Sequence, residues 1–277
     1  MKQDERKALI GKYILLILGS VLILVPLLAT LFSSFKPTKD IVDNFFGFPT
    51  NFTWDNFSRL LSDGIGGYYW NSVVITVLSL LAVMIFIPMA AYSIARNMSK
   101  RKAFTIMYTL LILGIFVPFQ VIMIPITVMM SKLGLANTFG LILLYLTYAI
   151  PQTLFLYVGY IKISIPESLD EAAEIDGATG IKCFFNITIP LLSPTVFFVM
   201  ITSIISGFQV FDTVYMMIGK ASPAFEATQT VVALFYRTAF DYGYKGYAAA
   251  ISILIFAAIM IVTVIQMIGQ KKWVNYD

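Results

Sequence analysis

The chain has 277 residues, of which 59% are hydrophobic and only 12% carry a formal charge. About a quarter of the residues of a soluble domain are charged, so a chain this apolar lacks the polar surface that water requires. It has no histidine and a single cysteine, Cys183, which excludes histidine-based catalytic triads, an internal disulfide and multi-cysteine metal sites. The net charge is +4, but no run of basic residues is long, so we expect no nucleic-acid partner. We also expect no metal and no cofactor.

Six runs of the chain lack Asp, Glu, Lys and Arg, and each exceeds the about 20 residues that span the hydrocarbon core of a bilayer. Backbone in lipid must satisfy its own hydrogen bonds, so such runs form helices. We therefore predict an all-α membrane protein with one domain, residues 1–277. The expected transmembrane helices are residues 13–33, 70–95, 104–127, 139–161, 187–209 and 247–269. The first is too long for a typical signal-peptide core, so we expect it to be retained.

Basic residues predict which side of the membrane each loop faces. With six spans and a cytoplasmic N-terminus, twelve of the 19 basic residues lie inside and seven outside, as the positive-inside rule requires. The seven outer ones are Lys36, Lys39, Arg59, Lys132, Lys220, Arg237 and Lys245. Both termini are then cytoplasmic.

Two outer segments are long, residues 34–69 and 210–246. The second contains an apolar stretch, Thr228–Tyr236, that is too short to span and is expected to lie at the membrane interface or on the outer face. Its tip carries turn-forming residues. These are Gly219, Ser222 and Pro223.

Acidic charge is concentrated in the cytoplasmic loop between the fourth and fifth spans. Five of the 15 carboxylates fall within ten residues there: Glu167, Asp170, Glu171, Glu174 and Asp176. Ser164 and Glu167 fit a capping box with Pro166 in the first turn. We predict a short helix from about residue 165 to 176, ended by Gly177 in a left-handed conformation. Small alanines and carboxylates suit close docking of an arginine-bearing partner, but the pattern also fits a solvated amphipathic connector.

This loop resembles the EAA loop of binding-protein-dependent ABC importer permeases. Glu171–Ala173 is followed after three residues by Gly177, and after nine more by Ile187–Pro190. The family pattern is E-A-A-x3-G-x9-I-x-L-P, and only Ile189 departs from it, in place of leucine. The resemblance implies a type I importer fold with the EAA loop, residues 165–190, as a coupling helix seated on an ATPase. The implied coupling residues are Glu167, Asp170, Glu171, Ala172, Ala173, Asp176, Gly177, Ile187 and Pro190.

The fuller string over residues 166–178, together with Phe208–Asp212 and Tyr236–Phe240, is similar to the carbohydrate branch of this family. It looks like the second permease of a maltose-, raffinose- or multiple-sugar-type system. The resemblance implies a heterodimer with another permease in the lipid of a bacterial cytoplasmic membrane, two cytoplasmic ATPase subunits, and an extracellular or periplasmic sugar-binding protein. That binding protein would touch the outer segment at Gly219, Ser222 and Pro223.

Rival functions are a secondary transporter or channel, and a membrane enzyme. The predicted spans hold no Asp, Glu, Lys or Arg for ion coupling and no acid, base or metal cluster for catalysis. No Walker A motif is present, so the ATPase should be another chain and this one not an enzyme. Sugars need hydrogen bonds and flat apolar faces, although such residues also serve helix packing. The candidate sugar pathway comprises Gln152, Ser203, Ser206, Phe208 and Gln209.

Overall fold

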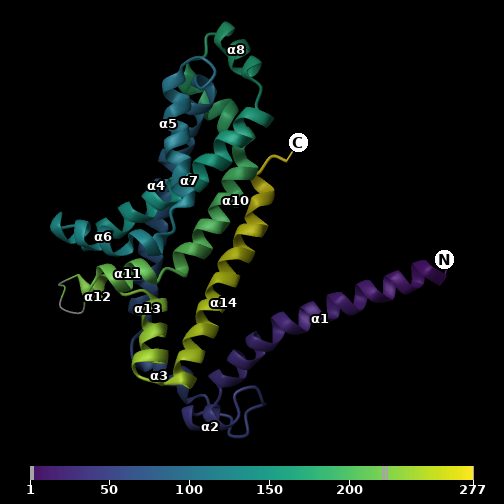
Figure 1. The fold of residues 1–277 in the computed structure, drawn as a ribbon, viewed down its shortest axis with the longest axis vertical. Helices are drawn as coiled ribbons and strands as arrows, with labels where there is room; N and C mark the ends of the chain where they lie inside the picture. Colours follow the sequence, from purple (N-terminus) through teal and green to yellow (C-terminus); the bar gives the residue numbers. More distant parts are fainter. Residues whose placement is uncertain (1–2, 220–221, 223, 277) are drawn as a thin grey trace. The chain divides into compact units, whose positions relative to one another are not determined.

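A computed structural model describes residues 3–219, 222 and 224–276, and every regular element in this part of the chain is a helix (Figure 1). The chain divides into two compact units. The first comprises Met1–Gly67 and Leu234–Ala257, and the second Tyr68–Ala233 and Ala258–Asp277. Three helices contribute residues to both: α4 (Ile65–Asn97), α13 (Val231–Tyr236) and α14 (Lys245–Gly269). That the chain acts as a single permease domain stays a prediction.

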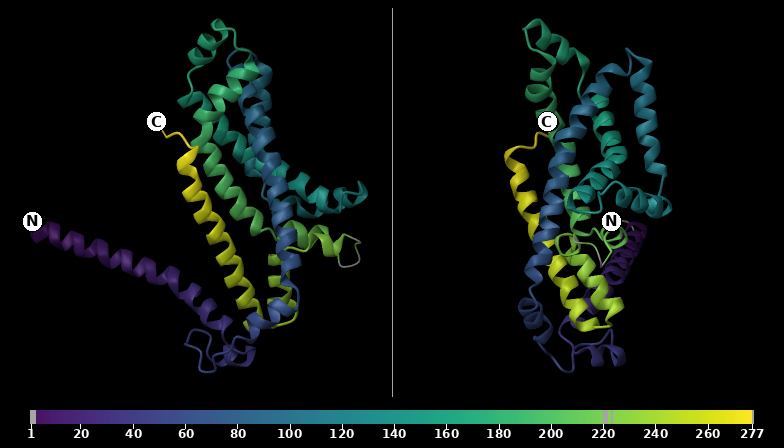
Figure 2. Two further views of the ribbon diagram at one scale, coloured as in Figure 1. Left: turned by 180° about the vertical axis from the view of Figure 1, so that it is seen from behind. Right: turned by 90° about the vertical axis from the view of Figure 1, so that its left-hand side faces the viewer.

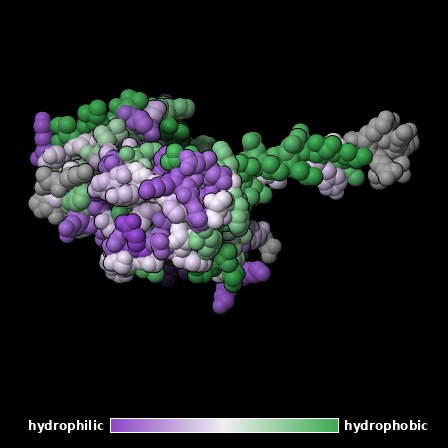
Figure 3. Space-filling model, turned by 90° about the horizontal axis from the view of Figure 1, so that it is seen from below, coloured by the Kyte–Doolittle hydropathy of each residue, from purple (hydrophilic) through white to green (hydrophobic). Residues whose placement is uncertain are grey.

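The first unit contains α1 (Gln3–Ser34), and apolar residues cover most of the coloured part of this helix in Figure 3. Within its span, Leu9–Ser34, only 6% of the most hydrophobic window is buried. A helix that is apolar all round needs lipid or other helices as its surroundings. The remaining elements of this unit are α2 (Thr38–Asp43), α3 (Asp55–Ser62) and the π-helix η3 (Arg237–Asp241).

The first long outer segment is organised around Lys36, which is buried although it is charged. Its ammonium donates hydrogen bonds to the carbonyl oxygens of Asn44 and Gly47, both at 2.6 Å. Burial lowers the pKa of Lys36, and the nearby Asp40 carboxylate opposes that shift. The segment is therefore a folded cap, since a buried cation requires such partners.

The second unit contains most of the helices. They are α5 (Lys102–Ile112), η1 (Leu113–Phe116), α6 (Phe119–Lys132), α7 (Thr138–Ser164), α8 (Glu167–Ile175), α9 (Gly180–Cys183), the π-helix η2 (Phe184–Thr188), α10 (Ile189–Phe208), α11 (Asp212–Met217), α12 (Phe225–Thr228) and η4 (Gln270–Lys272). Its core forms where α4, α7 and α10 meet. Ile94, Tyr157 and Leu192, one from each helix, are buried there.

In the part of the chain that the structure describes, five helical segments are long and apolar enough to cross a membrane, as predicted for all but the third span. The third, expected as a continuous helix over residues 104–127, is instead broken: Lys102–Phe116 and Phe119–Lys132 meet at 105° (Figure 2). The cause is Pro118, which has no N–H and disfavours helical backbone in the residue before it. Val117 is accordingly extended, with φ −97° and ψ 101°. Counted as one broken span, this pair gives six.

Candidate coupling loop and membrane cavity

The acidic loop forms a helical corner at one end of the second unit, where α8 lies beyond the ends of α4 and α7 (Figure 1). The predicted helix is present as α8, but the predicted capping box is not. Ser164 belongs to the last turn of α7, and Pro166 is the N-cap of α8 with no side-chain hydrogen bond. Ile165 is extended because it precedes proline, which ends α7 and moves the start of α8 two residues along.

Gly177 ends α8 in the left-handed conformation that the sequence predicts, with φ +80°. Its N–H donates to the carbonyl of Glu174 at 3.0 Å, and the N–H of Ala178 donates to that of Ala173 at 2.9 Å. These two bonds make a Schellman motif, which satisfies carbonyls that the helix end leaves open. The turn therefore requires a residue that tolerates positive φ.

The carboxylates of α8 divide into two groups. Asp170 is buried, and its Oδ2 accepts a hydrogen bond from Arg96 Nε of α4 at 2.7 Å. Tyr92 donates to the same oxygen at 3.2 Å. Asp170 therefore faces α4, and its predicted role in coupling stays a prediction.

The rest of the predicted coupling set is accessible to a partner. Glu171, Ala172, Asp176 and Gly177 are exposed. Half-buried members are Glu167, Ala173, Ile187 and Pro190. Ile187 lies within the π-helix η2, a rare geometry that is frequent at functional sites.

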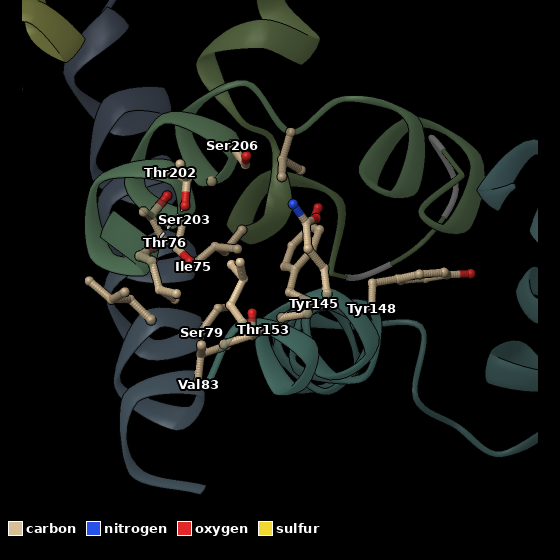
Figure 4. Close-up of a pocket in the computed structure, with 17 residues that line it drawn as sticks. Ile75, Thr76, Ser79, Val83, Tyr145, Tyr148, Thr153, Thr202, Ser203 and Ser206 are labelled. Carbon is tan, nitrogen blue, oxygen red and sulfur yellow. Dashed lines mark hydrogen bonds between the residues drawn. The ribbon is translucent and has the colours of Figure 1, made fainter. Parts of the chain in front are cut away.

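Within the second unit, a cavity of about 280 Å³ lies between α4, α7 and α10 (Figure 4). No acidic or basic side chain is among its described lining residues, whereas hydroxyl groups are numerous. They belong to Thr76, Ser79, Tyr145, Tyr148, Thr153, Thr202, Ser203 and Ser206. Among described residues, Thr76 Oγ1, Ser79 Oγ and the Tyr148 hydroxyl have no hydrogen-bond partner. These groups could bind a polar uncharged ligand.

Three of the five predicted pathway residues line this cavity: Gln152, Ser203 and Ser206. Gln209 instead lines a separate hollow, and Phe208 is buried and lines neither. The sequence argument missed Thr76 and Ser79 of α4 because isolated hydroxyls in an apolar run usually serve the helix itself. The sequence does hold one sign of close packing here, Gly207 of α10. In the structure, a Cβ at this position would lie 2.6 Å from the Thr76 methyl group. This glycine lets α4 and α10 approach closely at the cavity.

At the tip of the segment 210–246, two hydrogen bonds join described residues. The N–H of Ser222 donates to the carbonyl of Gly219 at 2.9 Å, and the Ser222 hydroxyl accepts from the N–H of Ala224 at 3.2 Å. Pro223, the third residue predicted here, lies outside the described residues. A contact with a binding protein at this turn stays a prediction.

Residues 87–274 match the family described as the inner membrane component of binding-protein-dependent transport systems. The chain belongs to this family. The match contains the whole EAA loop, residues 165–190, with its clustered carboxylates. It also contains two of the three cavity helices, α7 and α10, in full. It confirms the predicted importer permease, a transporter subunit and not an enzyme, over the secondary transporter or channel, and it places the protein in a membrane.

The chain is 71% identical over 194 residues to the multiple sugar-binding transport system permease protein of Streptococcus mutans, covering 70% of each protein. It is 36% identical to a probable starch degradation products permease of Thermoanaerobacterium thermosulfurigenes, over 69% of this chain and 70% of that one. These relatives confirm the resemblance to the carbohydrate branch of the family. A solved bacterial ABC transporter that imports the acidic polysaccharide alginate shares the fold, with a TM-score of 0.79 and 21% identity, covering 96% of this chain and 98% of that chain.

Proposed function

We propose that this permease imports a neutral sugar or oligosaccharide, and that the exposed face of α8 docks on a separate ATPase subunit. The observation that carries the docking proposal is the division of the α8 carboxylates. Asp170 holds the helix to the membrane core, while Glu171 and the neighbouring alanine present charge and a small contact surface outward. An arginine of the ATPase fits such a surface, because arginine binds a carboxylate through a rigid fork of donors.

The assembly requires further chains. The exposed apolar length of α1 supports packing against lipid and the spans of a second, different permease. Two ATPase subunits, one for each permease, follow from the importer family. We place the coupling loop and both termini on the cytoplasmic side of a bacterial cytoplasmic membrane, because the basic loops favour that orientation. The turn at Gly219 and Ser222 then faces the extracellular or periplasmic sugar-binding protein.

A neutral substrate follows from the chemistry of the cavity. Among its described lining residues the polar groups are hydroxyls and an amide, and none carries a charge that would neutralise an acidic or basic sugar in a site of low dielectric. Relatives named for multiple sugars and starch degradation products support the sugar class. Uptake of raffinose, melibiose, maltotriose and a galacturonate oligomer into cells expressing the importer tests it. We expect the cells to import one or more of the three neutral sugars and not the galacturonate oligomer. Selective import of the galacturonate oligomer would contradict the proposal.

Reversing the charge of Glu171 tests docking. A charge-assisted hydrogen bond is worth about 1.5–3 kcal/mol, so its loss should weaken ATPase binding about tenfold or more. We expect Glu171→Lys to insert normally but to lose copurification of the ATPase and sugar uptake together. The measurements are the ATPase-to-permease ratio in the purified complex and the initial uptake rate.

The matched control is Asp43→Lys on α2. Asp43 is also exposed, but it lies in the outer segment, and a lysine at the last residue of a helix suits the helix dipole. This variant should keep the wild-type ATPase ratio. Wild-type copurification of the ATPase with Glu171→Lys would show that this face of α8 is a connector only.

A further inference from the structure

We propose that Arg96 and Asp170 form the mechanical link through which displacement of α8 reaches the cavity helices. Arg96 lies in the last turn of α4, and Asp170 in the middle of α8, 74 residues later. The inference rests on the proposed docking of α8, since docking supplies the displacement. It assigns a positioning role to Arg96, a residue outside the EAA loop.

One guanidinium holds both sides of the helical corner. Arg96 Nε donates to Asp170 Oδ2 of α8 at 2.7 Å, while Nη1 donates to the carbonyl oxygen of Ile165 at 2.9 Å. Ile165 is the C-cap of α7. Tyr92, one turn earlier on α4, donates to the same carboxylate. α4, the end of α7 and α8 are therefore joined through a single side chain.

Burial distinguishes this link from the neighbouring ion pair. The side chains of Arg96 and Asp170 are 11% and 12% exposed. Lys100, three residues beyond the end of α4, lies 3.9 Å from Glu167 of α8, but their side chains are 64% and 42% exposed. Water screens the exposed pair and competes with it, so it cannot hold the two elements together.

Both helices that Arg96 joins to α8 continue to the cavity. On α4, Val83 lines the cavity 13 residues before Arg96, which is about 20 Å along a helix. On α7, Gln152 lines it 13 residues before Ile165. Packed helices move as stiff elements, so a shift of α8 is passed to two of the three cavity walls.

Removing the guanidinium separates docking from coupling. Arg96→Gln leaves the exposed carboxylates of α8 intact, so the ATPase should still copurify. Uptake of the best-imported sugar of the panel per ATP hydrolysed should fall by about tenfold, within the range of energetic coupling between distant sites. The matched control, Lys100→Gln, removes the exposed pair and should change neither quantity by more than about twofold.

A second variant separates coupling from stability. A buried ion pair can often be replaced by apolar side chains of similar size without loss of stability, whereas removing one partner leaves an unpaired buried charge. Arg96→Met combined with Asp170→Leu should therefore give a complex at wild-type yield that hydrolyses ATP but still does not couple it to uptake. A role in stability alone predicts restored uptake in this variant.

Three results would overturn the proposal: wild-type uptake per ATP in Arg96→Gln, restored uptake in the apolar double variant, or failure of both variants to assemble, which would assign the pair to folding. Failure of the underlying docking proposal is distinguishable. It would appear as wild-type ATPase copurification with Glu171→Lys, whatever the Arg96 variants do.

Discussion

Two adjacent carboxylates in α8, Asp170 and Glu171, have opposite surroundings. Successive helical residues are rotated by about 100°, so one faces the membrane helices and the other faces outward. Breaking the buried pair of Asp170 should cost about 3–5 kcal/mol. Breaking the exposed pair of Glu167 with Lys100 should cost about 0–1 kcal/mol. The difference makes Asp170 the anchor of α8 and leaves Glu171 free for a partner.

Gly177 gives a residue-scale prediction. A Cβ there would meet no atom within 4 Å, so the cost of substitution lies in the backbone and not in packing. An L-residue in the left-handed region costs about 1–2 kcal/mol, and a β-branched one is a pronounced outlier. The Gly177→Val permease should still assemble with the ATPase but lose uptake driven by ATP hydrolysis. The measurements are ATP hydrolysis and sugar uptake in the same vesicles.

Gly180→Ala is the matched control for that variant. Gly180 also has open space around the Cβ position, but its φ is not positive, and it begins the short helix α9. Alanine is a better helix former there, so uptake should stay at the wild-type level. Equal loss of uptake in the two variants would contradict the assignment of a conformational role to Gly177.

The left-handed conformation of Gly177 was predictable because a glycine directly follows a short run of helix-forming residues in the sequence. The partner of Asp170 was not predictable in that way. Arg96 is one of four basic residues between the second and third spans, with Lys100, Arg101 and Lys102. An acidic loop opposite a basic loop indicates attraction, but only folding decides which cation becomes buried.

At the scale of elements, hydropathy predicted the long helices and failed at the third. Proline inside an apolar run is compatible with a kink or with a complete break, because membrane helices tolerate both where neighbours satisfy the backbone. Pro26 and Pro88 lie inside continuous helices, whereas Pro118 separates η1 from α6. Proline alone therefore does not predict which helix breaks. The parts on either side of Pro118 also have different neighbours, since α5 and η1 pack on α7 and α6 packs on α11.

The C-terminal segment after α14 gives an element-scale prediction. The N–H of Asn275 donates to Ser193 Oγ at 2.9 Å, and the Asn275 side chain donates to the carbonyl of Pro190 in the coupling loop. Each bond contributes about 0.5–1.5 kcal/mol, so Ser193→Ala should release this segment. We expect trypsin to cleave after Lys272 several-fold faster than in the wild type. The cleavage rate is measured as the loss of a C-terminal epitope.

Tyr276→Phe is the control for this experiment. The Tyr276 hydroxyl donates to Gln270 at 2.7 Å, but this bond is exposed and lies within the segment itself. Its removal should leave the cleavage rate nearly unchanged. An unchanged rate in Ser193→Ala would mean that the hydrogen bond to Asn275 does not hold the segment in the membrane-embedded protein.

At the scale of the whole molecule, one ion pair bears on how the chain crosses the membrane between α4 and α7. Arg96 at the end of α4 contacts Asp170, which follows the end of α7, so both helix ends lie on the same side of the membrane. If α7 crosses toward that side, as its length and hydropathy predict, the chain must cross once between α4 and α7. We therefore predict that the bent pair Lys102–Phe116 and Phe119–Lys132 is a broken span and not a re-entrant loop. With that pair counted as one span, we predict six crossings, a number that composition alone leaves at five or six.

Labelling of single cysteines tests this topology. In a Cys183→Ser background, which removes the native buried thiol, cysteines replace Asp55, Lys132, Lys100 and Glu171 in turn, all of which are exposed. An impermeant maleimide added to sealed cells should label the first two positions, and the last two only after permeabilisation. Labelling of the Glu171 position from outside would reverse the orientation. If the Lys100 and Lys132 positions labelled alike, α5 and α6 would not cross the membrane, and the contact between Arg96 and Asp170 could not exist in the assembled protein.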